Sequence, residues 1–213
     1  MARNGANAAA ARRDVHAEDT RRALLAAARR AFAKNGYAAT SLDDIVGRAR
    51  LTKGALYHHF ASKAAVLEAV YIEMEQELIT SVTQAVMAAG SDAWSRIVAA
   101  LEAFFDASAE PEYVGIVLRD APHVLGARHG RELDQAIGLQ LVCELLAGMR
   151  EEGLLPAIPL EATARVLVAA TSEVAVSMAY AGDPALARKE GTAVVLAILE
   201  GFRASAQRPR RAR

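Results

Sequence analysis

The sequence predicts an all-α protein with about nine helices. Its 213 residues are 53% hydrophobic but only 5% aromatic, and Ala and Leu, which favour helices, supply much of the apolar content. Along most of the chain after residue 18, apolar residues recur at the three- and four-residue spacing of an amphipathic helix. Ser, Thr or Asp precedes several of these segments, and Gly or Pro follows others, as expected for helix caps and stops.

Residues 1–17 are predicted to form a mobile amino-terminal arm. They are small, polar or basic, and they lack the hydrophobic stripe with which a helix would dock. The first helix is then expected over residues 18–35, where apolar residues line one side, with Gly36 as its carboxy-terminal cap.

Two short helical patterns, separated by a break, occupy residues 41–60. The first has apolar residues at helical spacing, Thr40 or Ser41 as its N-cap and two aspartates in its first turn. The break falls at residues 50–52, and a second helix begins behind another N-cap residue, Thr52. Two helices this short, joined by so tight a turn, predict a helix-turn-helix.

The second of these helices has two different faces. At about 100° per residue, Gly54, Tyr57 and His58 fall on one side, whereas Leu56 and Phe60 fall on the other. The apolar side is expected to pack inward, and the polar side is left for a partner. A glycine costs about 1 kcal/mol in a helix interior, and close approach of a partner's backbone would offset that cost.

Lysines follow the N-caps of two successive helices, at Thr52-Lys53 and Ser62-Lys63. A cation in the first turn opposes the helix dipole unless an anion lies there, because helix N-termini bind anions such as phosphate. The pattern therefore indicates phosphate contacts, and two solvated surface lysines are the alternative.

Residues 20–70 resemble the DNA-binding domain of the tetracycline-repressor (TetR) family. The motifs that stand at the family's spacing are Phe32, Gly36-Tyr37, Thr40, Ile45, Thr52-Lys53-Gly54-Ala55-Leu56-Tyr57, His59-Phe60 and Ser62-Lys63. The resemblance implies a three-helix DNA-binding domain over residues 18–70 and a helical effector-binding and dimerisation domain over residues 71–205. Residues 206–213 then form a basic tail.

The resemblance also implies which residues contact DNA. Gly54, Ala55 and His58 are expected to approach base edges in the major groove. The other residues expected at the DNA, mostly at phosphates, are Thr40, Ser41, Thr52, Lys53, Tyr57 and Lys63. Because the second helix is poor in Arg, Asn and Gln, we expect DNA shape to carry much of the specificity.

The formal net charge of zero hides a split between the two ends of the chain. Residues 1–70 carry 12 Lys and Arg against 6 Asp and Glu, a net charge of +6, whereas residues 71–205 carry 9 against 19, a net charge of −10. A basic end joined to an acidic body indicates nucleic acid at one end only. Arginines of the amino-terminal arm offer an additional contact in a minor groove.

The acidic body is predicted to contain six further helices. They are expected over residues 63–89, 91–109, 112–119, 131–152, 160–181 and 185–205, with an irregular or only briefly helical stretch at 120–130. The first of these helices joins the basic head to the acidic body, so it is the expected lever between them.

The last two helices carry more apolar surface than a single protomer is expected to cover. In the final helix the apolar residues span roughly 200°, whereas a surface helix needs a stripe closer to 100°. We therefore expect a homodimer, as in the TetR family, with an interface at Val166, Val174, Met178, Val194, Val195, Ile198, Leu199 and Phe202. An unusually well-buried monomer is the alternative.

A pocket for a small-molecule effector is expected between the helices of the body, where bundles place ligand sites. The candidate lining residues are Trp94, Phe104, Phe105, Tyr113, His123, Met149 and Met178, each with ordinary core packing as its alternative role. No P-loop, dinucleotide-binding glycine motif, nucleophile elbow or zinc-protease motif occurs in the sequence. We therefore expect no enzyme activity, metal or cofactor.

The sequence thus predicts a cytoplasmic, homodimeric transcriptional regulator without a membrane segment. The single cysteine, Cys143, fits a reducing compartment, and the most apolar stretch is interrupted by Glu173. We expect a repressor that a small molecule releases from a pseudo-palindromic operator. A helical enzyme and a nonspecific architectural DNA binder are the alternatives, and activation in place of repression stays open.

Overall fold

The computed structural model describes the backbone of residues 2–207 and the side chains of residues 15–126 and 138–207. Residues 2–207 contain helices and no strand, so the predicted fold class is confirmed. In chain order the elements are α1 (Ala2–Ala39), α2 (Leu42–Ala49), α3 (Lys53–His59), α4 (Lys63–Ala88), α5 (Ala93–Ser108), α6 (Pro111–Tyr113), the π-helix η1 (Val114–Asp120), α7 (Ala121–Leu125), α8 (Ala127–Glu151), α9 (Leu160–Tyr180) and α10 (Pro184–Ala206).

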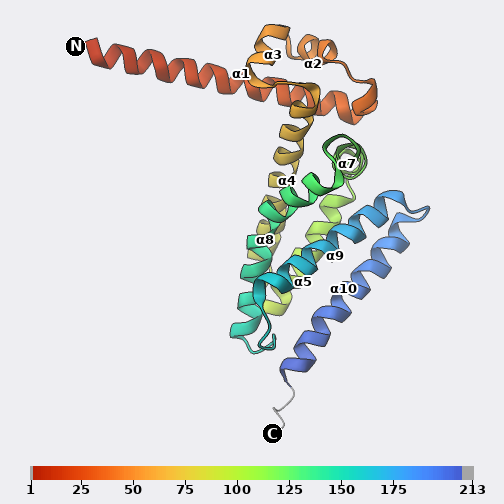
Figure 1. The fold of residues 1–213 in the computed structure, drawn as a ribbon. Coiled ribbons are helices and arrows are strands. Elements are labelled where there is room, and N and C mark those ends of the chain that lie inside the picture. Colours follow the sequence, from red (N-terminus) through yellow and green to blue (C-terminus); the bar gives the residue numbers. More distant parts are fainter. Residues whose placement is uncertain (1, 208–213) are drawn as a thin grey trace.

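Helices α1, α2 and α3 form a head at the amino-terminal end of the molecule (Figure 1). Phe32, Ile45 and Leu56, one from each helix, are buried together in its core. A capping box starts α2, because the Ser41 hydroxyl accepts the Asp44 N–H at 3.1 Å and the Asp44 carboxylate accepts the Ser41 N–H at 2.9 Å. The predicted helix-turn-helix is therefore present.

The expected arm at residues 1–17 differs from the structure. Helix α1 begins at Ala2, and its first part projects away from the head (Figure 1). The backbone of residues 2–17 is thus helical, whereas the mobility expected of this arm stays a prediction. The physical reason is local, since four consecutive alanines at residues 8–11 favour a helix even where no apolar stripe docks it.

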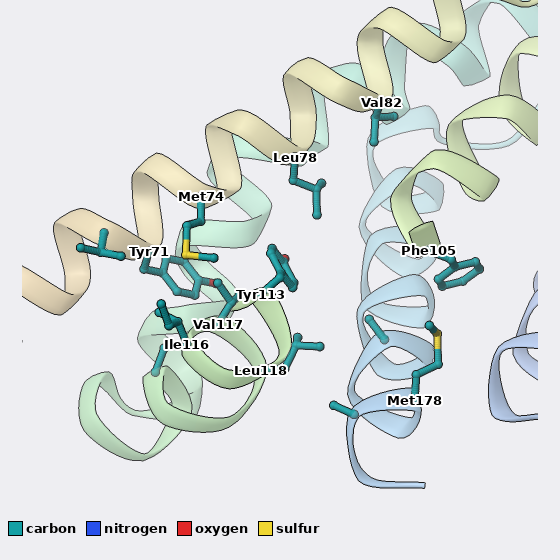
Figure 2. Close-up of a cluster of buried hydrophobic side chains, with 14 of the residues drawn as sticks. Tyr71, Met74, Leu78, Val82, Phe105, Tyr113, Ile116, Val117, Leu118 and Met178 are labelled. Carbon is teal, nitrogen blue, oxygen red and sulfur yellow. The ribbon is translucent and has the colours of Figure 1, made fainter. Parts of the chain in front are cut away.

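Helix α4 leaves the head and runs the length of the body, where it packs against α5 and α8 (Figure 1). Helix α4 therefore connects the head to the body, as the sequence predicted. Figure 2 shows Met74 and Leu78 of α4 on the side that faces Ile116 and Val117 of η1. Helices α9 and α10 pack against each other at the side of the body, where α9 also contacts α8 and α10 also contacts α5 (Figure 1).

The stretch expected to be irregular or only briefly helical, residues 120–130, is helical except at Gly126. The π-helix η1 passes directly into α7, where the Ala121 N–H donates to the Ile116 carbonyl, and Pro122, which has no backbone N–H, follows directly after this wide turn. Gly126, with φ of 84°, then separates α7 from α8. Helix α8 therefore begins at Ala127 and not at residue 131.

Among the helices of residues 2–207, α9 is the one whose length and hydropathy would suffice to cross a membrane. In the structure α9 packs against α8 and α10, and Leu167 and Ala175 are buried. Glu161, Arg165 and Glu173 lie along the same helix, and charged side chains inside a bilayer are costly. This packing and composition favour a helix of the protein body.

Gly191 allows α10 to approach α9 closely. A Cβ atom added at Gly191 would lie 2.3 Å from Cγ1 of Val174 and 3.1 Å from its Cβ. A β-branched side chain has one strongly preferred rotamer in a helix and cannot turn aside easily. The spacing of the α9–α10 pair therefore depends on a glycine at this position.

We expect Gly191→Ala to lower the free energy of unfolding by about 1–3 kcal/mol, because the added methyl group overpacks the α9–α10 contact. Urea denaturation followed by circular dichroism measures this change. Gly148→Ala in α8 is the matched control, since its added Cβ would meet the Ala93 Cβ at an ordinary 3.7 Å. Equal stability of the two variants would contradict the packing argument.

Candidate functional site

Helix α3 presents one polar face to the outside of the head. Gly54 and His58 are exposed and Tyr57 is 56% exposed, whereas Leu56 and Phe60 are buried. The two faces predicted from the sequence are therefore confirmed, and Ala55 is half-buried at their border.

Gly54 is not required by the packing of the head itself. A Cβ atom at this position would meet one atom of the protein within 4 Å, the Thr52 hydroxyl oxygen at a comfortable 3.8 Å. Thr52 caps α3, and its hydroxyl accepts the Ala55 N–H at 3.2 Å. The absence of a side chain at Gly54 thus leaves open space on the outer side of the helix.

Thr40 was expected at the DNA, but the structure buries it. Its side chain is 1% exposed, and the hydroxyl donates to the carbonyl of Gly36 at 2.8 Å, with the carbonyl of Ala31 also within 3.2 Å. The expectation of a DNA contact by this side chain is therefore wrong. Thr40 instead satisfies backbone carbonyls at the end of α1.

Lys53 lies on the exposed surface beside Asp43 of α2. Its Nζ is 2.9 Å from Asp43 Oδ2, and both side chains are more than half exposed. The hydrogen bond with Asp43, together with its negative charge, raises the pKa of Lys53. An exposed ion pair of this kind is weak, so Lys53 can exchange Asp43 for another anion.

Lys63 faces inward and holds the end of α1. Its Nζ donates to the carbonyls of Tyr37 and Thr40 at 2.9 and 2.8 Å and lies 4.1 Å from the centre of the Tyr37 ring. The sequence suggested a phosphate contact, whereas the structure gives this lysine a structural role. The carbonyl-rich end of α1 attracts the ammonium group for the same electrostatic reason that a phosphate would.

Polar contacts at two residues of the head, Tyr37 and Arg29, join the head to the body. The Asp120 carboxylate, at the end of η1, accepts the Tyr37 N–H at 2.7 Å. Arg29 of α1 forms ion pairs with Glu77 of α4 at 2.7 Å and with Glu112 of α6 at 3.0 Å. The sequence pattern did not reveal either contact, because the partners are far apart in the chain.

The body encloses a cavity of about 530 Å³ between α4, α5, η1, α8 and α9. Of the seven expected lining residues, Phe104 and Tyr113 line the cavity. Phe105, Met149 and Met178 are buried in the packed core on other sides of their helices. Figure 2 shows Phe105 and Met178 close to this region, within the hydrophobic cluster.

The two remaining candidates also lie outside the lining. Trp94 packs under Arg203 of α10, whose guanidinium carbon is 4.6 Å from the ring centre. His123 is exposed, and its Nδ1 is 2.7 Å from the carbonyl of Arg119. Helical periodicity identified these residues as apolar or aromatic but gave no information on which side of each helix the cavity lies.

The lining residues predicted from the sequence did not include a buried carboxylate in the cavity wall. Glu75 of α4 is 5% exposed, and the Tyr113 hydroxyl donates a hydrogen bond to its Oε1. Its position on the inward stripe of α4, between Met74 and Leu78, was the available signal. Both members of this pair line the cavity, together with Tyr71.

The outer side of α9 and α10 is partly apolar. Val166, Tyr180, Leu186, Val194 and Ile198 are 37–65% exposed, and we call these five residues the outer apolar patch. Met178, Val195 and Leu199 were also expected at a dimer interface, but they are at most 5% exposed within the protomer. Those three residues belong to the core of the protomer, because α10 turns Val195 and Leu199 toward α9 and α5, and Met178 lies on the buried side of α9. Val174 and Phe202 are half-buried.

Among the residues whose side chains are described, no group of three or more His, Cys, Asp and Glu is placed to hold a metal ion. Cys143 is half-buried on α8 and forms no disulfide.

Two family models match the chain. Residues 24–70 match the model described as bacterial regulatory proteins, tetR family, and residues 94–202 match the tetracyclin repressor-like C-terminal domain. A solved structure of a TetR-family transcriptional regulator from Pectobacterium atrosepticum is 32% identical, with a TM-score of 0.78, over 92% of this chain and 98% of that chain.

Curated relatives match mainly in the head. The transposon Tn10 TetC protein of Escherichia coli is 45% identical over 62 residues, which is 29% of this chain and 30% of the relative. The HTH-type transcriptional activator FasR of Mycolicibacterium smegmatis is 39% identical over 89 residues, which is 42% of this chain and 40% of the relative. The chain thus spans less than half the length of these curated relatives.

We expect Lys63→Met to lower the free energy of unfolding by about 1–3 kcal/mol, because it removes two hydrogen bonds from a charged donor to the end of α1. Lys53→Met is the control, since the exposed pair with Asp43 is worth at most about 1 kcal/mol. Chemical denaturation of both variants gives the comparison. A Lys63 variant as stable as the Lys53 variant would show that the inward contacts are not structural.

Proposed function

The chain belongs to the TetR family of bacterial transcriptional regulators, and we propose that it is a sequence-specific repressor that a small molecule releases from its operator. The observation that carries the proposal is the exposed outer face of α3, with Gly54, Tyr57 and His58 side by side. This face is the part of the helix-turn-helix that is free to enter a major groove. Such a protein acts on DNA in the cytoplasm.

In this proposal the outer face of α3 recognises DNA mainly because the helix can lie very close to the groove. Gly54 leaves room for the DNA backbone or a base edge, and His58 and the half-buried Ala55 lie next to it. Lys53 exchanges Asp43 for a phosphate, and the hydroxyls of Tyr57, Ser41 and Thr52 are near enough to the surface to assist. Because few side chains here can form bidentate base contacts, DNA shape carries much of the specificity.

The uneven distribution of charge along the chain supports docking of the head, and not the body, on DNA. The residues of the head and arm carry a net charge of +6 and those of the body −10. A polyanion therefore attracts one end of the molecule and repels the other.

A homodimer fits both the operator and the protein surface. The outer apolar patch on α9 and α10 is more apolar surface than a lone protomer normally leaves in water. A twofold dimer through this patch presents two copies of α3, which matches a pseudo-palindromic operator with half-sites about one helical turn or somewhat more apart. Val174 and Phe202 lie at the edge of the same surface.

The effector acts through elements that both line the cavity and hold the head. Helix α4 contributes Glu75 and Leu78 to the cavity and Glu77 to the ion pair with Arg29. The η1–α7 segment likewise contributes Val117 and Ala121 to the cavity and Asp120 to the contact with Tyr37. A molecule that spreads α4 and η1 therefore moves the head, and π-helical segments are often found where helices must shift.

Two other functions, an architectural DNA binder and an enzyme, give outcomes different from those of a regulator in one titration. The protein is titrated by fluorescence anisotropy against the DNA upstream of its own gene and against a shuffled copy, at two salt concentrations. Tight binding to the native DNA alone, with a steep loss at higher salt, supports the regulator. Equal binding to both supports an architectural protein, and no binding supports an enzyme. Activation, which the name of FasR makes relevant, is separated from repression by a reporter gene with and without the protein.

We expect Gly54→Ala to weaken operator binding by about 10–100-fold, because the added methyl group prevents close approach, which corresponds to about 1–3 kcal/mol. The stability of the variant should be unchanged or higher, since alanine favours a helix. Gly47→Ala in α2 is the matched control, because Gly47 is also helical and exposed with nothing within 4 Å of an added Cβ. Equal operator affinity of the two variants would remove Gly54 from the contact.

We expect Asp120→Ala to uncouple the effector from the DNA. The variant loses the bond to the Tyr37 N–H, so the ratio of operator Kd values with and without a releasing compound found by screening should fall from about 5–150 to below about 5. The compound's own Kd for the DNA-free protein should stay the same. The control is Asp106→Ala, which removes the pair with Arg188 that joins α5 to α10 at 2.5 Å. An unchanged ratio in the Asp120 variant would exclude η1 as a connection.

A further inference from the structure

Arg50, in the turn between α2 and α3, has a left-handed backbone. Its φ is 56° and its ψ is 40°, and the turn is closed by the Leu51 N–H, which donates to the Val46 carbonyl at 2.9 Å. A residue with a side chain is strained in this conformation because its Cβ crowds the following carbonyl oxygen, whereas glycine adopts it freely. The turn itself therefore favours a glycine at position 50.

The chain uses glycine at every other described position where φ is positive. Within residues 2–207 these positions are Gly36, Gly126 and Gly153, with φ of 77°, 84° and 71°. Arg50 is the exception, and its side chain is exposed, so packing of the head does not require it. Backbone strain that packing does not explain is concentrated at functional sites, which indicates that the Arg50 side chain acts on a partner.

The Arg50 guanidinium is exposed to solvent, whereas two neighbouring cations lie near carboxylates. Lys53 pairs with Asp43 at 2.9 Å. Arg48 follows Asp44 by one helical turn, a spacing at which opposite charges attract each other. Arg50 forms no ion pair or hydrogen bond with any side chain that the structure describes. Its N–H donors are therefore available to an anion from outside the protomer.

We propose that Arg50 binds a phosphate of the operator backbone, at the edge of the major groove that α3 enters. This inference rests on the proposed function, in which the beginning of α3 lies in the groove. Arg50 precedes Thr52, the N-cap of α3, by two residues, so the two Cα atoms are within about 7 Å of each other. A guanidinium forms paired, charge-assisted hydrogen bonds with a phosphate, which are stronger than bonds between neutral groups.

A phosphate contact of this kind has a distinct experimental signature. It positions the protein but carries no sequence information, so it strengthens binding to different DNA sequences by similar factors. Each such contact also releases counterions, so it steepens the dependence of log Kd on log salt concentration by about one unit. Arg50 therefore reduces the stability of the fold and increases the affinity for DNA, and these two effects have opposite signs.

The test is Arg50→Gly, which removes the guanidinium and the strain together. We expect the melting temperature, followed by circular dichroism, to rise by about 1–4 °C. Fluorescence anisotropy at several salt concentrations measures binding to the DNA upstream of the protein's own gene and to its shuffled copy. Binding to each DNA should weaken by about 10–100-fold at low salt, and the salt slope should fall by about one unit.

Arg48→Gly is the matched control, since it makes the same change at an exposed position two residues earlier, inside α2. It should lower the melting temperature, because glycine is unfavourable inside a helix, and it should leave the salt slope within about half a unit of its original value. Arg50→Lys keeps both the charge and the strain. It should therefore keep the melting temperature and the salt slope but lose part of the affinity, because an ammonium group cannot form the paired bonds.

Three results would overturn the proposal: an unchanged salt slope in Arg50→Gly, an equal fall of the slope in Arg48→Gly, or a melting temperature of Arg50→Gly below that of the unchanged protein. The proposed function fails separately, if the unchanged protein binds the native and the shuffled DNA equally well. A lower slope in Arg50→Gly would then still establish the phosphate contact. Absence of binding to either DNA would refute both.

Discussion

The left-handed turn at Gly36 leaves backbone groups at the end of α1 that other parts of the protein must satisfy. With φ of 77°, the chain departs from the helix before its last carbonyls find intrahelical partners. Lys63 of α4 donates to two carbonyls in this turn, Thr40 donates to a third, and Asp120 of η1 accepts the Tyr37 N–H. Because buried or half-buried backbone groups are costly when unpaired, this junction fixes how the head sits on both α4 and η1.

The same two elements form a wall of the cavity, so the junction and the cavity are mechanically connected. A hydrogen bond to a charged group contributes about 1.5–3 kcal/mol and weakens steeply with distance and angle. A small displacement of η1 relative to α4 is therefore enough to change the balance at the junction by the 1–3 kcal/mol that is typical of allosteric coupling. The ion pairs of Arg29 span the same two sides, since Glu77 is on α4 and Glu112 is on α6.

Much of this architecture could be predicted from local sequence signals, and its functional connections could not. Residues only a few positions apart in the chain predict the helix caps at Ser41 and Thr52 and the two faces of α3. The structure confirms all of these features. The contact between Tyr37 and Asp120 spans 83 residues, a separation at which helical periodicity carries no information. Periodicity likewise places Val195 on an apolar stripe but does not show whether α9 or a second protomer covers it. In the structure Val195 is buried within the protomer, on the side of α10 that packs against α9. Local spacing could not show the contacts of Lys63 for a related reason, because an ammonium group is attracted both by a phosphate and by the carbonyl oxygens at the end of another helix.

A cavity lined by a carboxylate reduces the stability of the empty body. Empty volume gives up packing contacts, and a charged group removed from water is costly unless its surroundings compensate for it. In the proposed function, an effector that fills the volume restores part of this free energy, so the filled body is more stable by an amount that grows with effector concentration. That gain is available to change the arrangement of α4 and η1, and with it the head. A perfectly packed body would be more stable without an effector and would have no such reserve, so in the proposed function the cavity itself supplies the free energy that the effector recovers.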